Sequence, residues 1–306
     1  MSMSRRTRVD LVRPHARYDE VADASAALVI SSYSSSFGLA SRLLAEPARS
    51  HVRNIYALVR VADEIVDAPR PGQGVDERQV ALDELETETS AAMERGSSTN
   101  LVVHAFARSA RHVGIDTSLT APFFASMRTD LTRTVHDEAS LTEYIYGSAE
   151  VVGLMCLRAF VADEAAPDQR YDELYTGAKH LGAAFQKVNF LRDFGTDSGD
   201  LGRRYLIGLD PADPTDAAWT RWLDEIDADL TIAADTIPRL PRGSRVAVCV
   251  AHDLFAELNA RLRATPASMA ARQRVRVPTA TKTRIAATAL LRRGHPRTTT
   301  TVVVGA

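Results

Sequence analysis

The chain has 306 residues, of which 45% are hydrophobic and 25% are charged. This composition is sufficient to bury a large core, and it excludes a disordered chain. The formal net charge is -2, so there is no overall positive field of the kind that attracts nucleic acid. The length fits one large domain or two small ones.

The cysteines and the N-terminal sequence indicate the compartment. Cys156 and Cys249 lie in apolar runs without Cys-x-x-Cys spacing, so we expect free thiols in a reducing compartment. The N-terminal segment contains arginines but not the apolar core of a secretory signal, and the apolar stretches are shorter than a membrane span. We expect a cytoplasmic protein. Residues 285–293 form either a surface for peripheral contact with a membrane or a helix packed on the core in the ordinary way.

Helical patterns dominate the chain. The first clear one follows Pro47, which suits a first helical turn, and it ends at a loop rich in Pro and Gly. Ser140 and Glu143 have the spacing of a capping box in front of an apolar helix. Apolar periodicity predicts helices over 47–67, 76–94, 144–161, 171–197, 216–237, 244–263 and 279–293.

No alternating strand pattern, internal repeat or linker interrupts this series. We therefore predict one all-α domain over residues 1–306, with its longest helices around a central cavity. We expect about 15 residues at the N-terminus and about 10 at the C-terminus to be loose.

Several common chemistries have no support in the sequence. The eight histidines form no His-Glu-x-x-His or Cys/His set, which argues against zinc. The chain has no Walker loop, no Gly-x-Gly-x-x-Gly fingerprint and no nucleophile elbow.

Two aspartate pairs carry the strongest chemical signal. Asp63 and Asp67 are four residues apart, as are Asp193 and Asp197, so each pair lies on one helix face. Like charges at this spacing repel each other, which suggests a bound cation. Magnesium binds one or two carboxylates together with water and phosphate oxygens, so two such pairs could clamp a diphosphate.

Spacing alone does not decide the matter, because two other acidic pairs share it: Asp19 with Asp23, and Glu225 with Asp229. An arbitrary acidic pair usually lies on a solvated surface. The surrounding sequence favours the first two pairs, since they belong to polar stripes on otherwise apolar helices that we expect to line a cavity. These stripes comprise Tyr56, Arg60, Asp63 and Asp67 on one helix, and Gln186, Asn189, Asp193 and Asp197 on the other.

Arginines accompany both pairs: Arg60, Arg192, Arg203 and Arg204. A guanidinium can bind phosphate oxygens bidentately. The alternative is internal ion pairing, of Arg60 with Asp63 or of Arg192 with an acid on another helix. Small residues within 144–161 have two explanations, close helix packing or a groove for a prenyl chain.

At this point the sequence resembles the squalene/phytoene synthase family, and within it the bacterial phytoene synthases. The matching segments occur in family order: SYSSSFGLASRLL, NIYALVRVADEIVD, YIYGSAEVVGLM, LGAAFQKVNFLRDFGTD, GRRYL and RVRVP. The resemblance implies the isoprenoid-synthase fold. It also implies dependence on magnesium, with manganese as a substitute, and no requirement for NADPH.

The resemblance further implies roles for individual residues. Asp63, Asp67, Asp193 and Asp197 would be the metal ligands, with Asn189 joining them, and Tyr144 would lie beside the reacting carbons. The implied diphosphate contacts are Ser34, Arg60, Gln186, Asn189, Arg192, Arg203, Tyr205 and Arg274, where the last assignment could shift to Arg272 or Arg276. Val152, Gly153 and Ala183 would line a prenyl channel. Phe255 stands where the family commonly has tyrosine.

The implied activity is that of a prenyltransferase in carotenoid biosynthesis. It joins two geranylgeranyl diphosphates head to head, through a cyclopropylcarbinyl diphosphate, to give phytoene. One alternative is a dehydrosqualene or squalene synthase that uses farnesyl diphosphate. Another is a non-catalytic helical assembly factor, which the presence of all four aspartates disfavours. The expected partner is therefore an isoprenoid diphosphate and not nucleic acid, and the oligomeric state is left open.

Overall fold

The computed structural model describes residues 15–34, 36–199, 203–210 and 212–296, without the side chains of residues 36–37 and 196–199. Within this part the chain is helical, and its only extended pairing is an isolated bridge between Val135 and Arg204. The helices are α1 Ala16–Tyr33, α2 Ser36–Ser41, α3 Ala48–Asp67, α4 Val75–Arg95, α5 Leu101–Val113, α6 Thr117–Thr132, α7 Glu138–Ile145, α8 Val151–Val161, α9 Pro167–Gly199, α10 Asp216–Thr236, α11 Arg242–Arg263, α12 Ala267–Ala270 and α13 Thr279–Leu291.

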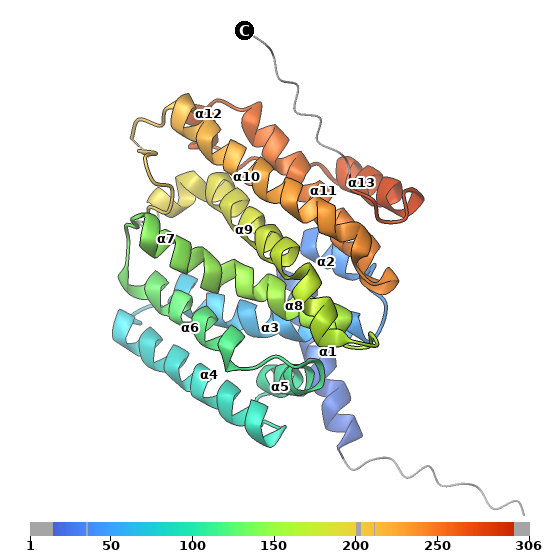
Figure 1. Cartoon of the computed structure of the whole chain (residues 1–306). Coiled ribbons are helices and arrows are strands. Elements are labelled where there is room, and N and C mark those ends of the chain that lie inside the picture. The colour runs from blue at the N-terminus through green and yellow to red at the C-terminus, as the bar shows by residue number, and fades with distance from the viewer. Residues whose placement is uncertain (1–14, 35, 200–202, 211, 297–306) are drawn as a thin grey trace, which may run out of the picture.

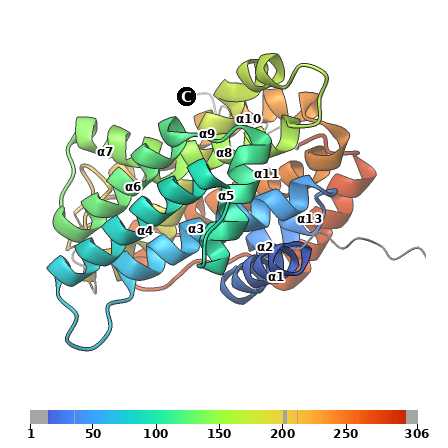
Figure 2. The same ribbon diagram turned by 90° about the horizontal axis from the view of Figure 1, so that it is seen from below.

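Helices α8 and α9 lie in the middle of the molecule, between α10 and α11 on one side and α3, α4 and α6 on the other (Figure 1). Seen from below, α7 lies at the opposite end of the molecule from α1 and α2 (Figure 2). One apolar core joins α3, α5, α6, α8 and α11, and a second joins α7, α9, α10 and α12. The predicted all-α fold class is confirmed, while the two chain ends predicted to be loose lie outside the described residues.

The helices over 47–67, 76–94, 216–237, 244–263 and 279–293 are confirmed with shifts of one or two residues. The capping box assigned to Ser140 and Glu143 is wrong. Asp137 caps α7 instead: its carboxylate accepts from the Ser140 amide at 2.8 Å, and its own amide donates to Ser140 Oγ at 3.0 Å. The helix therefore begins at Glu138, six residues earlier than predicted.

A π-helical segment, Tyr146–Glu150, separates α7 from α8. It lies directly against α6, because a Cβ added at Gly147 would come within 2.2 Å of the Pro122 carbonyl oxygen and of Ser126 Oγ. Single π turns of this kind are frequent at functional sites, where they change the direction of side chains along a helix. Here the segment begins two residues after Tyr144.

Sequence analysis did not predict α1, α5 or α6, although two of them carry clear start signals. The Asn100 side chain accepts from the amides of Val102 and Val103, and Asp116 accepts from the amide of Ser118. Gly96 and Gly114 end the preceding helices with positive φ angles.

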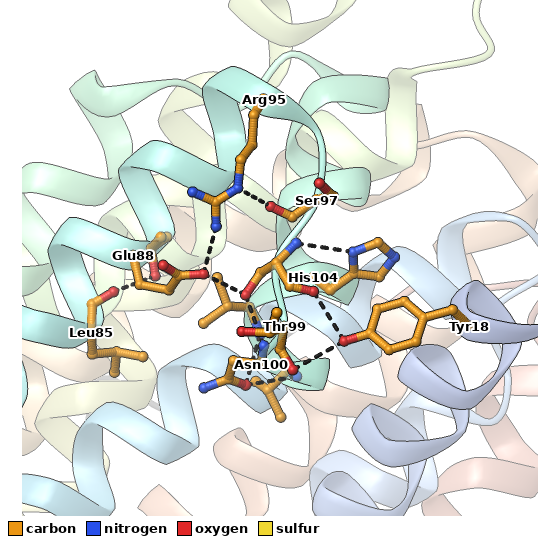
Figure 3. Close-up of polar contacts among 12 residues, drawn as sticks. Tyr18, Leu85, Glu88, Arg95, Ser97, Thr99, Asn100 and His104 are labelled. Carbon is orange, nitrogen blue, oxygen red and sulfur yellow. Dashed lines mark hydrogen bonds and ion pairs between the residues drawn. The ribbon is translucent and has the colours of Figure 1, made fainter. Parts of the chain in front are cut away.

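The turn between α4 and α5 is fixed to α1 by a compact polar network (Figure 3). The Tyr18 hydroxyl donates to the carbonyl oxygens of Ser98 and Thr99, both at 3.0 Å. His104 Nδ1 accepts from the Ser98 amide at 3.2 Å, which places the ring proton on Nε2. This network holds the outer helices together.

The stretch Glu138–Val161 is long and apolar enough to cross a membrane when judged by length and composition alone. In the structure, 56% of its most apolar window is buried inside the protein, and core helices pass the same test.

Candidate active site

The polar face of α3 contains the first aspartate pair. The Arg60 guanidinium lies over the Tyr33 ring, 4.3 Å from its centroid, and donates to Glu64 at 2.7 Å. The alternative of internal ion pairing is therefore correct for Arg60 except in its partner, which is Glu64 rather than Asp63. Ser34, the residue that ends α1, forms a hydrogen bond with the hydroxyl of Tyr56 on α3, one helical turn before Arg60.

Asp63 is the most perturbed carboxyl on this face. Burial, with the nearby charge of Asp67 as the next cause, raises its pKa to about 7, although the charge of Arg60 opposes the shift. A carboxylate that is costly to ionise in the folded protein gains stability from a nearby cation. Asp63 thus has the electrostatic character of a cation ligand.

Arg203 links α3 to the segment that follows α9. Its guanidinium donates to Asp67 at 2.6 Å and to the Val66 carbonyl oxygen at 3.2 Å, and only 8% of the residue is exposed. Its predicted neighbour Arg204 is exposed, and it contributes a backbone amide to the Thr134 carbonyl at 2.7 Å. Arg203 therefore belongs to the site, whereas the Arg204 side chain faces solvent.

An aromatic cluster adjoins Arg203. The Tyr144 and Tyr205 rings stack at 5.1 Å, and Tyr205 stacks on Phe190 of α9 at 4.4 Å. His136 lies 5.2 Å from Tyr144 and 5.6 Å from Tyr205, measured between ring centroids. Tyr144, Tyr205 and Phe190 are buried, so these side chains form a dry aromatic wall.

Sequence analysis missed a fifth carboxylate, Asp130 in the last turn of α6. It accepts from the Tyr205 hydroxyl at 2.6 Å and from the Tyr144 hydroxyl at 2.8 Å. Burial raises its pKa to about 6, against the lowering effect of the Arg203 charge and of both phenol hydrogen bonds. Asp130 has no acidic partner at helical spacing, so the pattern used to find the other aspartates could not find it.

The second aspartate pair lies near the C-terminal end of α9. Asp193 pairs with Arg192 Nε at 3.0 Å and with Arg274 Nε at 2.9 Å. Of the three late arginines considered, Arg274 is thus the one that contacts Asp193. Arg192 binds its own neighbour rather than an acid on another helix, which corrects that alternative. Asp197 is also on α9, but its side chain lies outside the described part.

A close backbone approach explains how Arg274 reaches Asp193. A Cβ at Gly195 would come within 2.1 Å of the Ala271 carbonyl oxygen, so the segment after α12 rests directly on α9. Only glycine permits this contact without displacement of one backbone.

Gln186 and Asn189 are half-buried on the same helix. The Asn189 Oδ1 atom is buried and has no hydrogen-bond partner in the described structure. A buried acceptor of this kind is costly unless a ligand satisfies it. Asn189 is therefore a credible oxygen donor beside Asp193.

An apolar cavity with about 720 Å³ of empty space, part of it open to solvent, lies between α2, α3, α8, α9 and α11. Its lining includes Leu181, Ala178, Gly177 and Leu174 of α9, and Gly153, Cys156, Leu157 and Phe160 of α8. Gly153 lines this cavity, and its predicted place in a prenyl channel stays a prediction. It also packs closely, since an added Cβ would lie 2.7 Å from the Ala178 carbonyl oxygen. The structure places Val152 beside the first core and Ala183 within the second, and neither lines this cavity.

Basic or amide groups of other helices bind the other two acidic pairs. Asp19 contacts His104 at 2.9 Å and Arg108 at 3.4 Å, and Asp23 accepts from Asn54 at 2.9 Å. Asp229, only 8% exposed, pairs with Lys187 at 2.9 Å and His180 at 2.7 Å. The expectation of a solvated polar setting is wrong for Asp229, whereas the side chains of Asp19, Asp23 and Glu225 are 29%, 37% and 44% exposed.

A sequence profile described as "Squalene/phytoene synthase" matches residues 30–281, which is most of the chain. The chain belongs to the squalene/phytoene synthase family. It is accordingly a head-to-head prenyltransferase, as the sequence motifs predicted.

Curated relatives in this family carry different product names. The chain is 31% identical over 206 residues to a presqualene diphosphate synthase of Rhodopseudomonas palustris. This alignment covers 64% of this chain and 69% of that protein. It is 28% identical to a 4,4'-diapophytoene synthase of Staphylococcus haemolyticus (58% and 59% covered) and 30% identical to a 15-cis-phytoene synthase of Paracoccus (57% and 56% covered). The matched part is thus a little more than half of the latter two proteins.

Solved structures confirm the isoprenoid-synthase fold. A dehydrosqualene synthase superposes with a TM-score of 0.77 at 23% identity, covering 91% of this chain and 98% of that one. A squalene synthase from Alicyclobacillus acidocaldarius gives a TM-score of 0.65 at 18% identity, covering 91% and 97%.

The donor chemistry of the site fits the divalent cation on which this family depends. Carboxylates and an amide oxygen are the ligands that magnesium prefers, and Asp63, Asp67, Asp193 and Asn189 supply them. Among the described residues, no three acidic, His or Cys side chains already converge.

Proposed function

We propose that this chain condenses two molecules of geranylgeranyl diphosphate head to head, through a cyclopropylcarbinyl diphosphate, to give phytoene. The position of the apolar cavity relative to the aspartates is the observation that supports the longer substrate. The family relationship supports the reaction type but not the chain length, because relatives with both product lengths are about equally similar.

The distance along α9 between Asp193 and the cavity indicates the length of substrate that fits. Its cavity residues run from Leu181 to Leu174, twelve to nineteen residues before Asp193, which corresponds to about 18–28 Å along the helix. Extended covalent chains advance roughly 1.2 Å per bond, so a farnesyl chain spans roughly 14 Å and a geranylgeranyl chain roughly 19 Å. With its diphosphate beside Asp193, only the longer chain would enter the cavity.

The residues divide the chemistry between them. Arg60, Arg192, Arg203 and Arg274 would bind and orient diphosphate oxygens, since each guanidinium lies beside a carboxylate of the site. A divalent cation held by Asp63, Asp67, Asn189, Asp193 and Asp197 would neutralise charge on the departing diphosphate. Gln186 and Ser34 would add neutral hydrogen bonds.

The carbocations require a different environment. Water would quench them, and the buried rings of Tyr144, Tyr205 and Phe190 together with the apolar cavity would exclude it. Aromatic faces also stabilise cations directly. Phytoene formation ends with loss of a proton, so this reaction consumes no NADPH.

Competition between the two diphosphates tests the proposal. We expect a mixture of geranylgeranyl and farnesyl diphosphate with magnesium to yield mainly phytoene, identified by mass. The cavity assignment is tested with Leu181→Trp, which narrows the end of the cavity nearer to Asp193 and should shift the preference towards farnesyl diphosphate. The matched control Leu181→Met should keep the geranylgeranyl preference. A mainly thirty-carbon product from the unaltered protein would instead identify a dehydrosqualene or squalene synthase.

We also propose that the end of α13 touches the membrane from which such substrates come. Leu290 and Leu291 are 53% and 86% exposed, and Arg292 and Arg293 follow them, while Ile285 faces the core. Co-sedimentation with anionic liposomes should decrease when Arg292 and Arg293 are replaced by Glu. Unchanged co-sedimentation would discard this surface.

A further inference from the structure

Asp130 occupies a position between the polar and the aromatic parts of the site. Arg203, which also binds Asp67, acts electrostatically on Asp130. The two carboxylate oxygens of Asp130 each accept a hydrogen bond from one phenol: Oδ1 from Tyr205 at 2.6 Å and Oδ2 from Tyr144 at 2.8 Å. Both acceptor sites facing the aromatic cluster are thus used, one for each ring.

This arrangement joins segments that are distant in sequence. Asp130 is in the last turn of α6, Tyr144 is near the end of α7, and Tyr205 follows α9. The isolated bridge between Val135 and Arg204 holds the segments that follow α6 and α9 beside each other. The carboxylate therefore lies at the one point from which it can fix both rings.

Two hydrogen bonds to one carboxylate affect the rings in two ways. They restrict rotation about the side-chain bonds, which keeps the stack of Tyr144 and Tyr205 in a single geometry. They also polarise each O–H bond towards the acceptor, which increases the electron density on the phenol. Aromatic faces with more electron density stabilise a nearby cation more strongly.

We propose that Asp130 is a positioning residue for the carbocation steps: it orients Tyr144 and Tyr205 and strengthens the attraction of their rings for the cationic intermediates. The inference rests on the proposed head-to-head reaction, but it does not depend on which chain length is used. Asp130 acts through the two phenols and does not itself contact the substrate.

The test combines Asp130→Asn with Tyr144→Phe and Tyr205→Phe. We expect Asp130→Asn to lower kcat by about 10²-fold, the scale of a small misplacement in an active site, with KM changed by less than about threefold. We also expect a larger share of the cyclopropylcarbinyl diphosphate, or of its hydrolysed alcohol, relative to the final hydrocarbon. Asp83→Asn, which removes a carboxylate that binds Arg128 of α6 at 2.6 Å, is the matched control and should keep the product ratio.

The decisive comparison is the coupling between the substitutions. In the Tyr144→Phe/Tyr205→Phe background, Asp130→Asn should cause little additional loss of kcat, because the groups through which Asp130 acts are absent. Losses that multiply independently would overturn the proposal. So would an unchanged kcat and product ratio in Asp130→Asn, or a fall in activity that only follows a fall in the folded fraction measured by thermal melting.

Failure of this inference is distinguishable from failure of the proposed function. All assays use the diphosphate that the unaltered protein turns over best. If the unaltered protein converts no isoprenoid diphosphate, the proposed function fails and this inference fails with it. If it does convert one and the variants behave additively, only the role of Asp130 is refuted.

Discussion

The pair Asp63/Asp67 on α3 and the pair Asp19/Asp23 on α1 have the same spacing but different surroundings. Asp19 and Asp23 are surrounded by basic and amide groups from neighbouring helices: His104 and Arg108 of α5, and Asn54 of α3. Asp63 has its carboxyl pKa raised to about 7 by burial, with Asp67 adding to the rise. The spacing of two carboxylates therefore says little, and the charges brought by other helices decide what a pair can do.

The pair Glu225/Asp229 on α10 agrees with this distinction. Lys187 of α9 approaches both carboxylates, at 3.4 and 2.9 Å, and His180 contacts Asp229. This pair is neutralised from within the protein. In the pair on α3, Arg203 binds Asp67 only, so it does not neutralise the charge of Asp63.

Removal of divalent cations should have the largest effect. We expect turnover to be abolished by thorough chelation and restored by magnesium or manganese, because the carboxylates of the α3 and α9 pairs repel a diphosphate unless a divalent cation lies between them. Product formation measures the effect on turnover, and the shift in Tm on adding magnesium with a diphosphate measures the effect on binding. Turnover that persists after chelation would refute the assignment of these pairs to metal.

Alanine substitution of single aspartates in the α3 and α9 pairs should have the second largest effect on turnover. Asp63→Ala, Asp67→Ala, Asp193→Ala and Asp197→Ala should each lower kcat by roughly 10²–10³-fold, because metal stabilisation of a developing charge contributes several kcal/mol. The fold should persist in Asp63→Ala, since this change removes repulsion between like charges, whereas Asp67→Ala also removes the carboxylate that the buried Arg203 binds and should lower stability. Activity loss explained by unfolding in thermal melting would make the motifs structural.

The neutralised pairs should show the opposite result. Asp229→Ala leaves Lys187 and His180 without their closest acceptor, so we expect a loss of about 1–3 kcal/mol in the free energy of unfolding, with kcat nearly retained. Glu225→Ala, at an exposed carboxylate 3.4 Å from Lys187, should cost at most about 0.5 kcal/mol. Denaturant titration and steady-state kinetics on both variants test this. A loss of kcat as large as that of the motif variants would erase the distinction.

The smallest effect concerns stability without metal. The pKa of Asp63 is about 7 in the folded protein against an ordinary value of 3.8, so the folded state binds the extra proton between these values. Stability therefore falls as pH rises through this window, and the cost is fully present above pH 7. Asp63→Asn should raise the Tm of the metal-free protein by a few degrees at pH 8 and leave it nearly unchanged at pH 4. A lower Tm at pH 8 would contradict this electrostatic account.

The local sequence pattern was sufficient to predict part of this fold and part of its candidate site. The apolar surroundings of Asp63 and Asp193 predicted α3 and α9 and the polar stripe on each, because helical periodicity is a property of neighbouring residues. It failed for Asp130, whose partners Tyr144 and Tyr205 lie 14 and 75 positions further along the chain. It also failed for Asp19, because its partner His104 is 85 positions away. Contacts of this kind depend on tertiary packing, which one sequence does not display.

The backbone of α9 contacts α8 and the π-helical segment before it, and this affects how enzymes of this kind diversify. An added Cβ at Gly153 would meet the Ala178 carbonyl oxygen at 2.7 Å, and one at Gly182 would meet that of Ala149 at 2.6 Å. Two helices in such contact cannot separate gradually, because interiors are packed like solids. New products would therefore evolve by exchange of side chains at the far end of the cavity. Related enzymes should differ in the length of the prenyl chain that they accept far more readily than in its width.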